Sequence, residues 1–270
     1  MTAIAIRGYY DMSGDSQRVV LAGYAATPSR WALFEKSWTE VLRNFEPRCE
    51  SLHMLDAAKL RGDFAIRNGW STERVDALIH ELLTKCLVTH GRPTGENGLF
   101  AAVCTIELDD FRRAAREISQ LRNRGPYWVC TEYVTGMALR LLPQDPELPP
   151  FCRMGTVEMC FDRGERFAGQ VRDERKRAMK RREGKRGPLS LVSEISEGVA
   201  RELPGLQAAD YLAWHFNRSA KGLISNWQTV LATDGRYNRF DYDMLVEWYD
   251  NWSDAKFLAM MDSFDTDQAA

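Results

Sequence analysis

At 270 residues, with 44% hydrophobic and 27% charged residues, the chain has an ordinary globular composition and is long enough to bury a substantial core. Its net charge of -2 excludes a uniformly basic coat for nucleic acid, although it leaves room for a local basic patch. The N-terminus lacks the charged start and long apolar core of a signal peptide, and no apolar run approaches the roughly 20 residues that span a bilayer. We therefore expect a cytoplasmic protein.

Hydrophobic periodicity and turn residues divide the chain into strands and helices. Two apolar strands, 2–11 and 18–27, are expected to form a hairpin with a Ser13-Gly14 turn. The elements predicted after them, in chain order, are a helix over 29–45 capped by Ser29, a helix over 71–91, a strand over 99–108, a helix over 127–142, a strand over 156–162, a strand over 189–196, a helix over 204–218 and a helix over 239–252.

This order of elements predicts an α/β fold, with a mixed sheet flanked by helices. No repeat or long linker divides the chain, so we expect a single domain over 1–262. A helical insertion, at about 29–98, separates the second and third strands. The last residues, 263–270, are expected to be a frayed tail.

Three aspartates fall where solvent exposure alone explains a carboxylate poorly. Asp11 ends the first strand, Asp162 ends the strand in VEMCFDRG, and Asp210 lies in line with apolar positions of the helix that contains LQAAD. Oxygen ligands are those that Mg²⁺ prefers, and two such ions about 4 Å apart would clamp a phosphoryl group during in-line displacement. The three carboxylates are therefore candidates for one divalent-metal site.

Each of these aspartates also has a purely structural interpretation. An aspartate shortly before a Ser-Gly pair, like Asp11, is typical of a turn former, and Asp162 before Arg-Gly is typical of the end of a strand. Asp210 could instead pair with Arg201 or Arg218 on the surface of its helix. Taken singly, each structural interpretation is the simpler one; the metal hypothesis depends on all three occurring beside core elements.

Four parts of the chain resemble, in order, the motifs of the family catalogued as domain of unknown function 3800: YYDMSGD with VVLAGYAA, SLHMLDAAKLRGDF, VEMCFDRGERF and PGLQAADYLAWHFNR. The resemblance covers nearly the whole chain, and its most specific marks are the Asp-x-Ser-Gly start and the Gln-x-x-Asp helix. That family is similar to the ribonuclease H-like superfamily, whose members use clustered carboxylates and divalent metal to cut or transfer nucleic-acid strands. The resemblance therefore implies a ribonuclease H-like fold and a nuclease that uses Mg²⁺ or Mn²⁺.

The resemblance also implies where the functional side chains lie. In that superfamily, carboxylates sit on the first strand, the first helix, the fourth strand and the last helix, and these places correspond here to Asp11, Glu132, Asp162 and Asp210. Glu132 is reached by topology rather than by a motif. His53, in LHMLD, is a further mark of the family and is expected to position a water or a leaving group. A hydrogen-bonded structural histidine is an equally good interpretation.

One residue departs from the family's first motif, which is commonly Asp-Glu-Ser-Gly. Met12 stands here in place of the glutamate. If that glutamate binds metal, this chain has lost a ligand or uses Asp15 instead. Because alternate residues of a strand point to opposite faces, Asp11 and Met12 cannot both face one site, and we expect that nothing is lost.

A basic segment, 172–187, holds nine Lys or Arg residues against three acids. It is a candidate for binding the phosphates of a nucleic acid, and a solvated helix is an equally good interpretation. The sequence thus supports two hypotheses. The first is a metal-dependent nuclease that acts on DNA or RNA. The second is a non-catalytic nucleic-acid-binding or regulatory protein that retains the fold.

Overall fold

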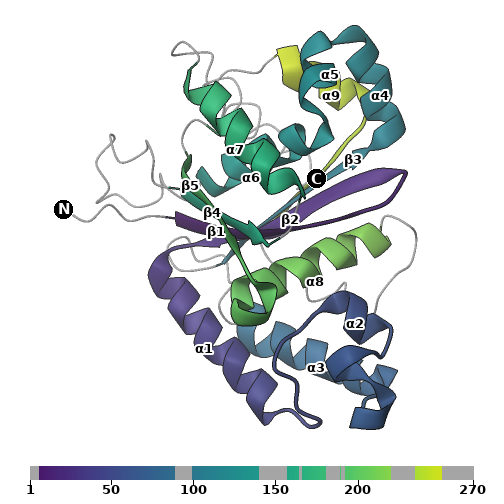
Figure 1. Cartoon of the computed structure of the whole chain (residues 1–270), viewed down its shortest axis with the longest axis vertical. Helices are drawn as coiled ribbons and strands as arrows, with labels where there is room; N and C mark the ends of the chain where they lie inside the picture. The colour runs from purple at the N-terminus through teal and green to yellow at the C-terminus, as the bar shows by residue number, and fades with distance from the viewer. Residues whose placement is uncertain are drawn as a thin grey trace, which may run out of the picture.

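The computed structural model describes residues 6–88, 99–139, 157–163, 166–180, 189, 192–219 and 235–250. Over these residues the protein is a mixed α/β structure in which one sheet lies between two layers of helices (Figure 1). The strands are β1 (Ile6–Gly14), β2 (Arg18–Ala26), β3 (Phe100–Glu107), β4 (Val157–Asp162), β5 (Val192–Gly198) and β6 (Gly235–Phe240).

Helices cover both faces of the sheet. They are α1 (Pro28–Asn44), α2 (Met54–Ala58), α3 (Thr72–Leu82), α4 (Leu108–Glu117), α5 (Ser119–Arg124), α6 (Pro126–Leu139), α7 (Arg166–Met179), α8 (Pro204–Ser219) and α9 (Tyr242–Asp250). Figure 1 shows α1, α2, α3 and α8 below the sheet and the other helices above it. A π-helical stretch, Leu83–Val88, continues α3.

The sheet has the strand order β5-β4-β1-β2-β3-β6. Strand β2 runs antiparallel to both of its neighbours, whereas β4 is parallel to β1, β5 is parallel to β4 and β6 is parallel to β3. Every strand except β2 therefore points the same way, and their carboxyl ends meet at one edge of the sheet. We call this the carboxyl edge. In open α/β sheets this is the side at which ligands bind.

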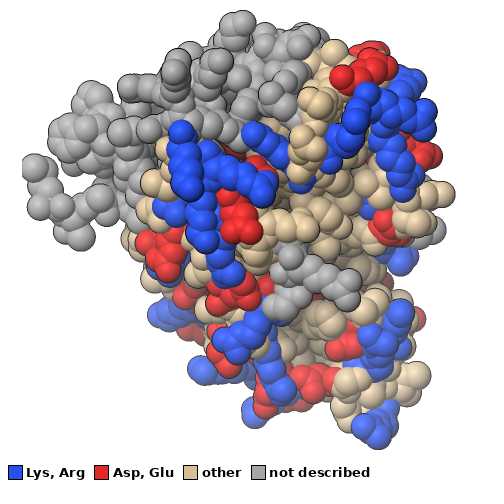
Figure 2. Space-filling model, turned by 45° about the horizontal axis from the view of Figure 1, so that its top comes forward, with Lys and Arg blue, Asp and Glu red and all other residues tan. Residues whose placement is uncertain are grey.

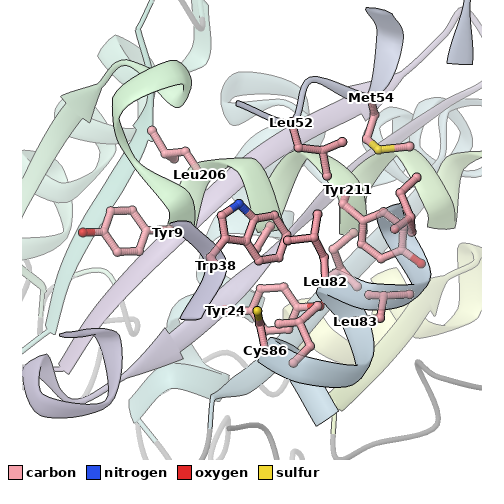
Figure 3. Packing of buried hydrophobic residues seen from close by; sticks show 14 of the residues in the cluster. Tyr9, Tyr24, Trp38, Leu52, Met54, Leu82, Leu83, Cys86, Leu206 and Tyr211 are labelled. Atoms are coloured by element: carbon pink, nitrogen blue, oxygen red, sulfur yellow. The ribbon is translucent and has the colours of Figure 1, made fainter. Parts of the chain in front are cut away.

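Alternation along the strands separates two hydrophobic cores. On β1, Tyr10 packs into the core beneath α6, whereas Tyr9 packs into the core between the sheet, α8 and the helical insertion. Trp38 of α1 lies at the centre of the second core and is fully buried (Figure 3). The insertion therefore covers α8, so that this helix is enclosed on both sides.

Most of the predicted elements are present, with three corrections. The first strand does not end at Asp11 but continues to Gly14, and the hairpin turn uses Asp15: its Oδ1 accepts hydrogen bonds from the backbone N–H of Gln17 (2.8 Å) and Arg18 (3.1 Å). Helix α1 begins at Pro28 after an N-cap residue, Thr27, rather than at a Ser29 cap. Strand β6 was not predicted, and its last two residues, Arg239 and Phe240, fall in the predicted last helix, which begins instead at Tyr242.

Other predicted boundaries agree more closely. Ser71 does cap α3, since its Oγ accepts a hydrogen bond from Arg74 N at 3.4 Å. Gly91 and the tail 263–270 lie outside the described residues. Within the described part of the chain, no helix combines the length and the apolar character needed to cross a membrane.

Candidate functional site

The face of the sheet that α8 covers changes from apolar to polar toward the carboxyl edge. The register places Cys160, Tyr9 and Tyr24 side by side in one row. The next polar positions along the same strands are Asp162, Asp11, Ser13, Thr105, Arg18 and Glu107, which the register brings to the same end of this face. A fold buries polar side chains in such a group at a cost, so this edge is the first place to look for a function.

Asp11 belongs to this polar group and is not a turn former. It pairs in register with Ala22 inside the β1–β2 ladder, and its neighbour Met12 packs against the core on the opposite face. The predicted separation of Asp11 and Met12 is therefore confirmed. Tyr9, two residues before Asp11, contacts α8 so closely that a Cβ on Gly205 would lie 2.3 Å from its ring. Ser13, two residues after Asp11, accepts a hydrogen bond from Asn217 Nδ2 of α8 at 2.9 Å. Asp11 thus faces the middle of α8.

Asp162 lies beside Asp11. The parallel pairing of β1 and β4 ends at Tyr10 and Phe161, so Asp11 and Asp162 are the next residues of the two strands, and alternation places both on the α8 face. One oxygen of Asp162, Oδ1, accepts a hydrogen bond from Ala200 N at 2.9 Å. That bond ties the end of β4 to the turn that precedes α8. Asp162 therefore has a structural role, as one interpretation of the sequence expected.

Asp210 extends from α8 to the insertion. Its Oδ2 accepts a hydrogen bond from the backbone N–H of Met54, the first residue of α2, at 2.8 Å. The pKa of this carboxyl group is raised to about 6, chiefly by burial; the hydrogen bond from Met54 and the nearby His53 act to lower this pKa, and the negative charges of Asp162 and Asp56 act to raise it. The pKa of Asp210 responds to both Asp162 and His53, so each of these two groups lies within electrostatic range of Asp210.

Gln207, one turn before Asp210, makes the second contact with the same segment. Its Oε1 accepts from Leu52 N (3.0 Å) and from Trp38 Nε1 (2.9 Å), and its Nε2 donates to Ala200 O (3.0 Å). The Gln-x-x-Asp motif of α8 therefore binds the backbone on both sides of His53 (Figure 3 shows Leu52 and Met54 on the segment that passes over α8). We call residues 52–54 the clamped segment.

His53 itself lies at the N-cap position of α2 with 52% of its side chain exposed. Its Nδ1 is 2.9 Å from Asp56 Oδ2, and the other oxygen of Asp56 accepts from Arg61 Nε at 2.6 Å. Burial acts to raise the pKa of Asp56, but the bonds from His53 and Arg61 outweigh it and leave that pKa below its usual value. Asp56 is therefore ionised at neutral pH, and it fixes the orientation of the imidazole ring.

The structure does not bring Glu132 together with the three aspartates, which corrects the topological expectation. Glu132 is fully buried in the layer on the other side of the sheet. Its Oε1 accepts from Trp128 Nε1 at 3.1 Å and its Oε2 accepts from Leu189 N at 3.0 Å, and both partners belong to the core beneath α6. The helix was predicted correctly, but its place in the topology does not determine which way this side chain turns.

We tested whether the aspartates fit a metal ion. Their hard carboxylate oxygens suit Mg²⁺ or Mn²⁺, and Asp11 and Asp162 lie on the same face of adjacent strands. Among the residues that the structure describes, however, no three His, Cys, Asp or Glu side chains come together as a metal-binding group. A bound Mg²⁺ would therefore have to be held through one or two carboxylates and keep several of its waters.

The described part of the basic segment, 172–180, is engaged within the fold. Arg175 donates to the carbonyl oxygens of Val192 (2.6 Å) and Ser193 (2.8 Å) on β5, and Arg172 forms an ion pair with Glu197 at 2.6 Å. Arg177 pairs with Glu174. Figure 2 shows Lys and Arg side chains next to Asp and Glu side chains over the described surface of this face. These contacts favour the structural interpretation of the described residues; 181–187 lie outside them.

Several residues of the polar edge were missed by sequence reasoning. The sequence patterns did not single out Asp56, Arg18, Thr105 or Asn217, and only the strand register or the helix packing brings them to the site. Asp56 carried one usable signal, because it lies three residues after His53, a spacing that places both on one face of a helical turn.

Comparisons with known proteins add no identification: no family model, curated protein or solved structure matches the chain.

Proposed function

We propose that this protein is a divalent-metal-dependent phosphodiesterase that acts on nucleic acid. Asp11 and Asp162 are the metal ligands, Asp210 stands behind them on α8, and His53 lies at the solvent side. The observation that carries the proposal is the placement of two carboxylates on one face of adjacent parallel strands, one residue beyond the last paired position, with a third carboxylate whose pKa responds to one of them.

The strand order supports the resemblance to the ribonuclease H-like superfamily. Three antiparallel strands, followed by two strands parallel to the first, give the order β5-β4-β1-β2-β3, and β6 extends that sheet at one end. The fold alone does not fix an activity, so the weight of the proposal rests on the carboxylates.

Each residue has a task in the proposed reaction. A bound Mg²⁺ or Mn²⁺ would supply an activated water and would stabilise negative charge on the leaving oxygen. The β-ladder fixes the backbone of Asp11, and the hydrogen bond from Ala200 N orients the carboxylate of Asp162 before any ligand arrives. Asp210, through Met54, fixes the insertion against the site.

Thermal unfolding with and without Mn²⁺ tests the metal site directly. Mn²⁺ at one hundred times its Kd should stabilise the protein by about 2.7 kcal/mol, a rise in Tm on the order of 5 °C. Asp11→Asn and Asp162→Asn should abolish the rise. Asp109→Asn is the matched control, because Asp109 lies on α4 with 94% of its side chain exposed, and it should keep the full response. Nuclease assays on single- and double-stranded DNA and RNA would then identify the substrate. An equal rise in Tm for all four proteins would contradict the proposed site.

A non-catalytic protein that retains the fold is the second candidate. One observation favours it: Asp162 and Asp210 each give an oxygen to a backbone N–H, which are bonds that a purely structural aspartate also makes. For such a protein, no Mn²⁺-dependent rise in Tm is expected, and binding of an oligonucleotide would be unaffected by Asp11→Asn.

A further inference from the structure

The clamped segment suggests a specific role for His53. Leu52 N and Met54 N, on either side of His53, are both bound by side chains of α8, and the helix that follows begins at Met54. Two backbone anchors of this kind leave the intervening residue little freedom, although its ring is half exposed. An exposed side chain on a doubly anchored backbone is an arrangement that serves a reacting group better than it serves packing.

The ring is oriented as well as anchored. Asp56 is ionised, so its Oδ2 can only accept, and the proton of a neutral His53 must therefore lie on Nδ1 at the 2.9 Å contact. Nε2 is then the basic nitrogen. Arg61 holds the other oxygen of Asp56, so the carboxylate cannot rotate away. Asp210 of α8 also lies within electrostatic range of His53, and Asp162 of β4 lies within electrostatic range of Asp210.

We propose that His53 is the general base of the site, that its proton-accepting atom is Nε2, and that Asp56 and Gln207 are its positioning residues. As a water oxygen bonds to phosphorus, Nε2 takes a proton from that water. The bond from phosphorus to the leaving oxygen breaks, and this oxygen takes a proton from solvent. The choice of a phosphodiester as substrate rests on the proposed function. The assignment of His53 as an oriented base does not, because it follows from the contacts of His53 alone.

The tautomer of His53 tests the first part without any activity. In ¹⁵N-labelled protein, long-range ¹H–¹⁵N correlation spectra at pH 8 should show neutral His53 protonated on Nδ1, the minor form of free histidine. Asp56→Ala should shift His53 toward the Nε2-protonated form. Asp63→Ala, which removes an exposed carboxylate near the same turn, should leave the tautomer unchanged, and His80 on α3 serves as an internal reference. Protonation of His53 on Nε2 in the unaltered protein would overturn the proposal.

Hydrogen exchange tests the role of Gln207. Gln207→Met keeps the length of the side chain but removes the acceptor for Leu52 N, so exchange of that amide should accelerate at least tenfold relative to amides of β1 and β2. Gln207→Glu retains the acceptor and should preserve most of the protection. Equal protection of Leu52 in Gln207→Met and in the unaltered protein would show that Gln207 does not position the segment.

Kinetics separate this proposal from the function itself. Where Mn²⁺-dependent cleavage is found, His53→Gln should lower kcat by at least tenfold with little change in KM, and the acidic limb of the pH profile should be lost. Cleavage with kcat and pH profile unchanged in His53→Gln would overturn the base assignment while leaving the nuclease intact. If the protein cleaves no nucleic acid but His53 shows the expected tautomer, the proposed substrate is wrong and the assignment of His53 as an oriented base stands.

Discussion

The helices α6 and α8 occupy equivalent positions on opposite faces of the sheet, and both carry buried polar side chains. On α6, Glu132 accepts hydrogen bonds from a tryptophan of its own helix and from Leu189 within the same layer. On α8, Gln207 and Asp210 reach the backbone of a different segment, which carries an exposed histidine. Both helices therefore bind the backbone of a distant segment, and the difference is that the segment bound by α8 carries an exposed histidine near a charged edge of the sheet.

The largest effect that would separate the two helices is expected on α6. Glu132→Ala should lower the free energy of unfolding by about 3 kcal/mol or more, because Trp128 Nε1 and Leu189 N would be left buried without their acceptor. Urea denaturation measures the loss. Glu194→Ala is the control, because Glu194 is an exposed residue of β5, and its expected change is below about 0.5 kcal/mol. A comparably small loss for Glu132→Ala would remove the contrast between the helices.

On α8, replacing the buried carboxylate of Asp210 is expected to raise the stability of the protein at neutral pH. The pKa of Asp210 is about 6 in the folded protein against 3.8 for an unperturbed aspartate, so the native state binds the proton more tightly than the unfolded chain. The cost of ionising Asp210 is absent below about pH 4, grows as the pH rises, and reaches about 3 kcal/mol above pH 6.

Asp210→Asn, which removes that charge and keeps an oxygen for Met54 N, should therefore raise Tm at pH 7 and flatten the pH dependence of stability between pH 4 and 6. Thermal unfolding at a series of pH values measures both. A variant that is less stable than the unaltered protein at pH 7 would mean that the charge is compensated in the native state.

A smaller pair of variants compares two buried threonines. Thr105 lies on the α8 face, and its Oγ1 has no hydrogen-bond partner in the described structure, whereas Thr135 of α6 donates to Thr131 O at 2.6 Å. Thr105→Val should be neutral or stabilising by about 1 kcal/mol, and Thr135→Val should be destabilising by a similar amount. Chemical denaturation of the two proteins under the same conditions gives the comparison; equal losses would show that Thr105 makes a bond in solution.

The elements with strong periodicity were predictable from the sequence. The strands of the hairpin and α8 agree with expectation within a few residues, because long apolar patterns outweigh local uncertainty. Strand β6 was missed because GRYNRF is short and polar and directly precedes a helical pattern. The hairpin turn was misassigned because Gly14 is the stronger turn signal in the sequence, yet it is the side chain of Asp15 that binds the turn backbone.

The candidate site was predictable only in part. The sequence grouped Asp11 and Asp162 as residues at strand ends; the structure has both on one face of neighbouring strands, although β1 continues past Asp11 to Gly14. The direction of Glu132 depends on which neighbours offer N–H groups, and Leu189 is 57 residues away in the chain. The same limit applied to Gln207: its motif was evident, but its partners come from α1 and from the segment before α2. Contacts between distant segments leave no periodic trace in a sequence.

The arginines of α7 have a further consequence for the behaviour of the protein in solution. Strand β5 is at the end of the sheet, where unpaired carbonyl groups would otherwise offer a template for a strand from another molecule. Arg175 occupies the carbonyls of Val192 and Ser193, and Arg172 bonds to that of Ile195. The basic segment was a candidate for binding nucleic acid. Its described arginines instead protect the edge strand β5 from pairing with a strand of another molecule.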